Sequence, residues 1–232
     1  MLFRSGEELA FEAQEILRRV VRAHAGPVAG SGLATARALL FRFRRSLPGL
    51  EVVHTYARKG DDLFVEVDVE AGEGQDSRSG VVKGVAWTDA PGAGTLDPLF
   101  VRDVLRRFSP EWVFGLAGLL TSGSPPGREY DEMAVGESAR VDGRAAVSLE
   151  FRGDREAAPR TLLIDLTTWT VSEVLQGGLR WRFYDYFEVG DGSIVPRRVE
   201  VWRDRSLVDA IEVIDLDRGA AFPPEWFPVV AR

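Results

Sequence analysis

The chain has 232 residues, of which 45% are hydrophobic and 28% are charged, and this is the composition of an ordinary globular protein. Its formal net charge of −7 argues against a general nucleic-acid role, because binding phosphates requires a basic surface. It contains no cysteine and only two isolated histidines, His24 and His54, so disulfides and thiolate sites are excluded and a histidine metal site or a Ser/His/Asp triad has little to draw on.

The first predicted element is an amphipathic helix over residues 7–24. Its apolar residues recur at helical spacing, with glutamates near its start and arginines near its end, as the helix dipole favours. Residues 1–8 lack the basic start and apolar core of a signal peptide, although a chain that begins after a removed signal would look the same. The compartment therefore stays open: periplasmic or otherwise extracytoplasmic if a signal was removed, and cytoplasmic if not.

A first meander of strands is predicted over residues 34–88. Residues 63–69 alternate apolar with acidic side chains and form the clearest half-buried strand of the chain. Residues 33–47 fit a strand or a helix, and we prefer the strand. Residues 81–87 are predicted as a single strand, preceded by a polar loop over residues 71–79.

Two covering helices are predicted over residues 97–120. Asp97-Pro98 suits the N-cap and first turn of one helix, and Ser109-Pro110 begins a second helix that runs to about Leu120 and is almost wholly apolar. The second helix is too short to span a membrane, and no run of about 18 apolar residues exists elsewhere in the chain. We expect these helices to cover the concave side of a sheet, where a mobile pair would form a lid over a hydrophobic cavity.

A second meander is predicted over residues 128–217, and an aromatic tail over residues 218–232 should pack on the sheet. A three-residue loop over residues 190–192 brings apolar residues together on one face, with Phe183 opposite Val199, whereas a two-residue loop would mix the two faces. A two-residue turn then adds the last strand. We call the three charges that cross this apolar face the charged row, and they are Asp185, Arg197 and Glu212.

Three stretches carry a resemblance to a known family. Residues 163–169 (LIDLTTW) are similar to its strand, Asp-containing turn and return strand, residues 184–198 to its hairpin with a glycine turn and a proline, and residues 224–227 to its closing segment. The chain thus resembles the LolA/LolB-type superfamily of outer-membrane lipoprotein carriers and receptors, which includes sensor-type regulators. The resemblance implies a strongly curved antiparallel sheet, open or a half barrel, with two to three helices over its mouth and a hydrophobic cavity for acyl chains.

On that resemblance, aromatic and apolar side chains line the cavity, although the same side chains could simply form a filled core. Arg197 could meet a ligand head group, or the charged row could be a structural ion network, because charges on an apolar face must be paired. The candidate ligand-binding residues are Trp87, Trp112, Phe114, Leu116, Trp181, Phe183, Phe187 and Arg197.

We therefore predict one mainly β (α+β) domain over residues 1–232, a monomer without cofactor or metal. It would bind or carry lipid or lipoprotein acyl chains without catalysis, as a transport factor or chaperone, and it would do so in the periplasm if a signal peptide was removed. The alternative is an interaction or sensor module of the same fold that binds a protein segment, and an enzyme is the third hypothesis. A cavity lined by Trp, Phe and Leu favours the carrier, a filled core with an exposed groove the module, and a cleft with convergent polar groups an enzyme.

Overall fold

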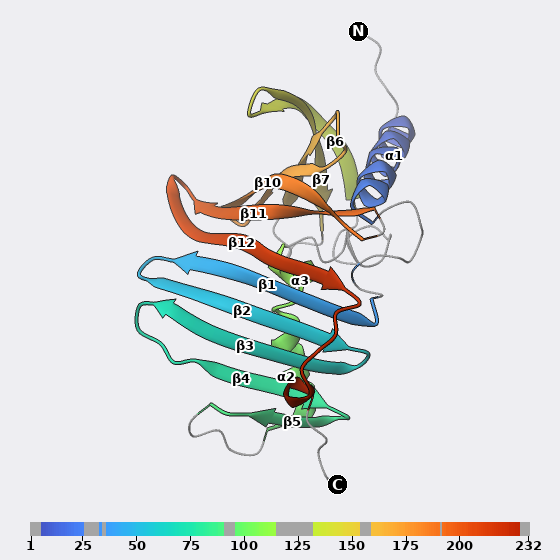
Figure 1. The fold of residues 1–232 in the computed structure, drawn as a ribbon. Helices are drawn as coiled ribbons and strands as arrows, with labels where there is room; N and C mark the ends of the chain where they lie inside the picture. Colours follow the sequence, from blue (N-terminus) through green and yellow to red (C-terminus); the bar gives the residue numbers. More distant parts are fainter. Residues whose placement is uncertain are drawn as a thin grey trace. The chain divides into compact units, whose positions relative to one another are not determined.

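The structure is a computed structural model that describes residues 6–25, 33, 36–90, 96–114, 132–153, 159–190 and 192–227. These residues form a mainly β protein with one twelve-stranded antiparallel sheet, in the order β5-β4-β3-β2-β1-β12-β11-β10-β9-β8-β7-β6 (Figure 1). The chain divides into two compact units, which are described separately. Unit 1 is Met1–Gly32 with Ala117–Val208, and unit 2 is Leu33–Leu116 with Asp209–Arg232. The single domain and the strong curvature of the sheet stay predictions.

Unit 2 holds the first meander and the covering helices. Its elements are β1 (Ala38–Leu47), β2 (Leu50–Lys59), β3 (Asp62–Ala71), β4 (Ser77–Val82), β5 (Val85–Thr88), α2 (Pro98–Arg106), α3 (Pro110–Val113), η2 (Pro224–Trp226) and, from Asp209 on, β12 (Ser206–Arg218). The strand predicted within residues 33–47 is confirmed as β1. The single strand predicted over residues 81–87 is wrong, because Lys83 and Gly84 take positive φ angles of 49° and 79° and turn the chain between β4 and β5. Two such residues make the tight turn whose twist fits a hairpin.

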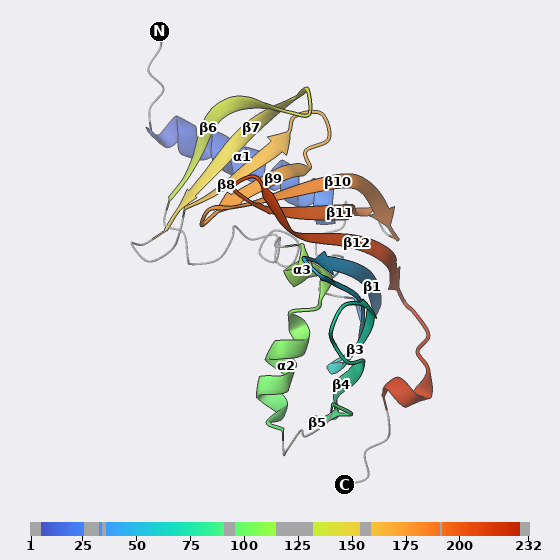
Figure 2. The ribbon, with the colours of Figure 1, turned by 90° about the vertical axis from the view of Figure 1, so that its left-hand side faces the viewer.

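The sheet of unit 2 is covered on both faces. The helix α2 packs on β3, β4 and β5 on one side of the strands, and Figure 2 shows η2 on the other side. We call the side under α2 the lid face. Its strand residues, which share one face by register and alternation, include Leu39, Phe41, Phe43, His54, Tyr56, Leu63, Val65 and Val81, and all are buried. The predicted packing of the aromatic tail on the sheet is confirmed, because the Trp226 ring stacks on Phe64 at 4.8 Å.

Unit 1 holds the N-terminal helix and the second meander. Its elements are α1 (Gly6–Ala25), β6 (Glu132–Val141), β7 (Arg144–Arg152), β8 (Arg160–Asp165), β9 (Val171–Gln176), β10 (Leu179–Val189), β11 (Ser193–Arg203) and the first residues of β12. The predicted register of β10 and β11 is confirmed, with Phe183 opposite Val199 and Phe187 opposite Val195. Gly192 takes the left-handed conformation that the three-residue loop requires, at a φ of 86°. The helix α1 packs on β6 and β11.

Part of the predicted second covering helix lies outside the described residues. The structure describes α3 and the following Phe114, whereas residues 115–120, with Leu116 among them, are not described. The predicted pairing of Glu212 with Arg197 joins residues of different units and stays a prediction. In the described ranges, no helix is long and apolar enough to cross a membrane.

Candidate functional site

The helix α2 starts where the sequence predicts and is apolar on two sides. The Asp97 carboxylate accepts the backbone N–H of Leu99 at 2.9 Å, and a proline occupies the first turn. Leu105 is 3% exposed and faces the sheet, together with the buried Val101, whereas Leu99 and Phe100 are 73% and 67% exposed. An ordinary surface helix carries polar residues on its outer side, so these exposed side chains indicate a partner or ligand on that side.

An aromatic cluster joins the covering segment to the lid face. Its five rings belong to Phe41, Phe43, His54, Phe108 and Phe114. Phe41 stacks on Phe43 at 4.7 Å, His54 lies between Phe43 and Phe108 at 4.8 and 5.1 Å, and Phe114 meets Phe41 edge-on at 5.5 Å. Within the described residues no salt bridge involves α2. The covering segment is therefore held on the sheet by apolar contacts.

His54 is the one member of this cluster with ring nitrogens, and it is 7% exposed. Burial, with a smaller contribution from the Arg45 charge, lowers its pKa from 6.5 to about 4, so the ring is neutral at pH 7. Its buried Nδ1 has no hydrogen-bond partner among the described residues. A buried polar atom without a partner destabilises the folded state. Moving the covering segment away from His54 therefore costs less free energy than it would in a cluster made only of carbon rings.

The structure separates the predicted ligand-binding residues of unit 2. Trp87 pairs with Gly80, which lies opposite Phe64, and therefore shares the η2 face with Phe64, at 6.1 Å between ring centres. A Cβ atom at Gly80 would lie 2.5 Å from the Trp87 ring nitrogen, so only glycine fits beneath this ring. Phe114 is fully buried on the lid face, and Trp112 is 58% exposed. Trp87 and Phe114 thus lie on opposite faces of one sheet.

The predicted residues of unit 1 lie on β10 and β11. Phe183 is buried, and Trp181 and Phe187 are half-buried. The exposed Arg197 places its guanidinium 4.7 Å from the centre of the Phe187 ring, which is a cation–π contact.

The contacts that the structure describes for the charged row are with residues outside the row. Among the described residues, Glu212 makes a salt bridge with Arg44 at 3.7 Å, and none joins Asp185 to Arg197. Both Asp185 and Arg197 are exposed. The head-group role of Arg197 and the structural role of the row stay predictions.

Sequence reasoning missed a cavity of about 540 Å³ in unit 1, to which several charged and hydroxyl side chains contribute. It lies among the β6–β7 hairpin, the turn between β8 and β9, and the middle of β10. Its lining residues are Val141, Asp142, Arg144, Asp165, Thr168, Thr170, Ser172, Arg182, Phe183, Tyr184, Asp185, Tyr186 and Ile194. In the described part of the chain, no group of three or more His, Asp or Glu residues is placed to hold a metal ion.

No protein-family model and no curated protein matches the chain. Among solved structures, a protein described as an outer membrane lipoprotein-sorting protein domain from Vibrio parahaemolyticus is similar at a TM-score of 0.51 and 9% identity, over 94% of this chain and 97% of that one. The chain has the fold of that domain. The resemblance inferred from residues 163–169, 184–198 and 224–227 is thus confirmed at the level of fold, which is all that a likeness at this identity shows.

Two further solved structures are similar at lower scores. A DUF1329 family protein from Desulfovibrio piger matches at a TM-score of 0.49 and 10% identity, over 95% of this chain and 98% of that one. LprF from Mycobacterium bovis matches at a TM-score of 0.33 and 14% identity, over 91% and 96%.

Proposed function

We propose that the protein is a non-enzymatic carrier or binding protein for lipid or lipoprotein acyl chains, with α2 and α3 as a lid over the lid face. The observation that carries this proposal is the aromatic cluster, in which the rings of Phe108 and Phe114 of the covering segment contact those of His54 and Phe41 of the sheet. The fold that the chain shares with the lipoprotein-sorting domain supports it. The strongly curved sheet and a periplasmic transport or chaperone role belong to the same proposal.

In the proposed mechanism, an acyl chain replaces one set of apolar contacts with another. A lid that opens uncovers the side chains of Val101, Leu105 and the lid face, and an acyl chain can replace them as the apolar neighbour. Each methylene group that leaves water contributes about 0.8 kcal/mol, so a chain of about ten buried methylenes supplies roughly 8 kcal/mol toward holding the lid open. Trp112 of α3 is a candidate contact of the same acyl chain, as is Leu116, which lies outside the described residues.

A photoreactive fatty acid tests where the chain binds. The protein is irradiated with a fatty acid that carries a diazirine in its chain, digested, and analysed by mass spectrometry for labelled peptides. We expect labels on β1–β3 and on the inner side of α2, around Leu105, and we expect excess unlabelled fatty acid to remove them. Labels confined to the outer side of α2, around Leu99, or labels that no competitor removes, would contradict the lid.

An interaction module that binds a protein segment is the second candidate, favoured by the exposed Leu99, Phe100 and Trp112 on the outer side of the covering segment. The double variant L99S/F100S separates the two candidates. If it loses a co-purifying protein while fatty-acid labelling persists, the outer side binds protein. If it loses neither, the interaction module is contradicted.

A further inference from the structure

The strands β9 and β10 pair along only part of their length. Their pairs run from Leu179 with Gln176 to Arg182 with Glu173, and β10 then continues to Val189 with β11 as its partner among the described strands. We call the point after these pairs, where β9 and β10 separate, the parting. The 540 Å³ cavity is lined by residues on both sides of it, from the start of β9 and the middle of β10. Its volume falls within the range of small-molecule sites, which is about 300–1,000 Å³.

The buried His24 and the half-buried Tyr186 hold the parting in place. The backbone N–H of Val171 donates to His24 Nε2 at 3.3 Å, and its carbonyl accepts the Tyr186 hydroxyl at 2.5 Å. Because Nε2 accepts, the proton of the neutral ring is on Nδ1, which donates to the Ile194 carbonyl at 3.3 Å. The main-chain groups of Val171 are thus satisfied by side chains in place of a neighbouring strand. The parting is a built feature of unit 1 and not a frayed strand end.

The backbone of β10 is distorted at the cavity. Asp185 has a φ of 53°, in the left-handed region that favours glycine, although it lies inside a strand. Neighbouring residues of a regular strand point to opposite faces, whereas the five consecutive residues 182–186 all line this one cavity. Strained conformations of this kind persist where the surrounding structure imposes them, and they gather at binding sites.

Among the described residues, the charges of the cavity wall leave the carboxylate of Asp185 without a partner. Arg182 contacts Asp142 at 2.7 Å, and Arg144 lies 3.6 Å from Asp165. Asp185 is exposed and has no hydrogen bond or salt bridge with the described residues. The remaining polar groups of the wall include the hydroxyls of Thr168, Thr170 and Ser172. Within the part of the chain that the structure describes, both arginines that line the cavity are therefore paired with a carboxylate, and Asp185 is not paired.

We propose that this cavity binds a small ligand with a primary ammonium group, with Asp185 as the counter-ion and the neighbouring hydroxyls as further hydrogen-bond partners. A free amino alcohol and the ethanolamine head group of a phospholipid share this chemistry. The lining residues belong to unit 1, whereas the lid face belongs to unit 2, so the site stands independently of the proposed carrier function.

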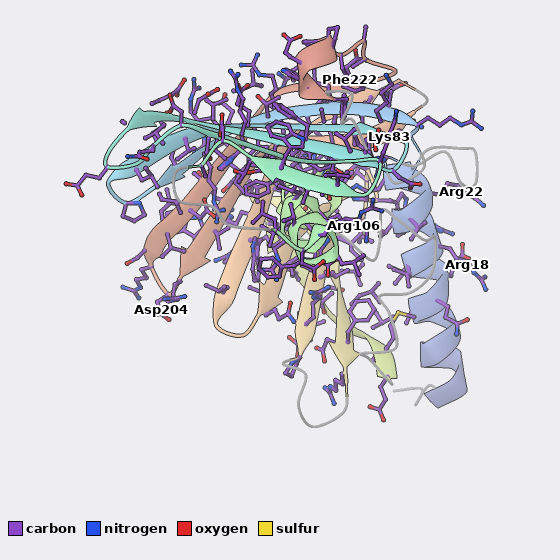
Figure 3. All side chains as sticks on the ribbon, turned by 90° about the horizontal axis from the view of Figure 1, so that it is seen from below. Arg18, Arg22, Lys83, Arg106, Asp204 and Phe222 are labelled. Atoms are coloured by element: carbon purple, nitrogen blue, oxygen red, sulfur yellow. The ribbon has the colours of Figure 1, made fainter. Side chains whose placement is uncertain are left out.

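The test compares two matched substitutions, Asp185→Asn and Asp204→Asn. Both aspartates are exposed and have positive φ angles, of 53° and 56°. Asp204 lies at the turn between β11 and β12 (Figure 3). It is not among the residues that line the cavity. Asparagine tolerates this backbone conformation, so both variants keep the fold and lose one negative charge. Circular dichroism of both variants checks that the fold is kept.

Binding is measured by calorimetry with ethanolamine and by sedimentation with vesicles of phosphatidylethanolamine, with phosphatidylcholine vesicles, whose nitrogen has no N–H, as the control. We expect the wild type and D204N to bind at least one amine probe and D185N to bind it about tenfold or more weakly. Binding of free ethanolamine identifies a soluble amine, and binding of the phosphatidylethanolamine vesicles alone identifies the head group. Absence of both, equal binding by D185N, or an equal loss in D204N would overturn the proposal.

Discussion

Replacing His54 by phenylalanine should remove a pH dependence from the stability of unit 2. The imidazole lies between the rings of Phe43 and Phe108, and its buried Nδ1 has no partner among the described residues. Phenylalanine keeps an aromatic ring between Phe43 and Phe108 and removes the buried polar atom. We expect the free energy of unfolding of H54F at pH 7 to equal that of the wild type or to exceed it by about 1–2 kcal/mol.

The magnitude of the pH effect follows from the pKa. Burial lowers the pKa of His54 from 6.5 to about 4, so between these values the unfolded chain holds a proton that the folded protein does not. The free energy of unfolding of the wild type therefore falls as the pH falls from about 6.5 to about 4. At about 1.4 kcal/mol per pKa unit, the loss is on the order of 3 kcal/mol. His24, whose pKa burial also lowers to about 4, adds a similar loss in unit 1.

Urea unfolding of both proteins, followed by circular dichroism at several pH values between about 7 and 4.5, measures this effect. The contribution of His24 is present in both proteins and cancels in the difference between them. We expect the free energy of unfolding of H54F, relative to that of the wild type, to increase by roughly 3 kcal/mol as the pH falls over this interval. A difference that stays constant with pH would show that His54 titrates normally, and the burial argument would then be refuted.

Three substitutions test other contacts by urea unfolding. Glu173→Ala removes a buried carboxylate that binds two arginines at 2.6 and 3.0 Å and should cost roughly 2–3 kcal/mol, whereas Glu150→Ala, in an exposed pair, should cost under about 1 kcal/mol; equal costs would refute the difference in burial. Tyr186→Phe leaves the β9 carbonyl without its donor and should cost about 1–2 kcal/mol, and no change would mean that water replaces the hydroxyl. Trp226→Ala removes the ring stacked on Phe64 and should expose the tail to limited trypsin digestion; unchanged resistance would speak against that packing.

The features that the sequence predicts well are those fixed by near neighbours. The register of β10 and β11 follows from the alternation of apolar residues and from Gly192, which are all within one hairpin. The start of α2 follows from Asp97 and the proline after it, because a cap needs only the next two residues.

The face on which a side chain lies was harder to predict, and Trp87 shows why. Residues 81–87 are rich in β-branched and apolar residues, as a single strand can be, but the turn at Lys83 and Gly84 folds the segment back on itself. The face of Trp87 is then set by its pairing with Gly80, which lies opposite Phe64. The hydrophobic pattern does not change across this short hairpin, so Gly84 is the only sign of the turn in the sequence.

The cavity of unit 1 depends on contacts that no local pattern contains. The parting of β9 and β10 is held by His24, which lies 147 residues before its partner Val171. An isolated histidine in a helix gives no sign of that role. Aspartate is disfavoured inside strands and tolerates a positive φ, but Asp185 stands in an otherwise regular strand pattern that gives no sign of the distortion.

Native mass spectrometry of the protein purified from cells tests the central claim most directly. A carrier of acyl chains should retain lipid, so we expect a population heavier than the 25.6 kDa chain by the mass of an acyl lipid, which is lost on delipidation and restored by adding fatty acid. A protein that is empty when purified and that also fails to bind a fluorescent fatty acid would contradict the account.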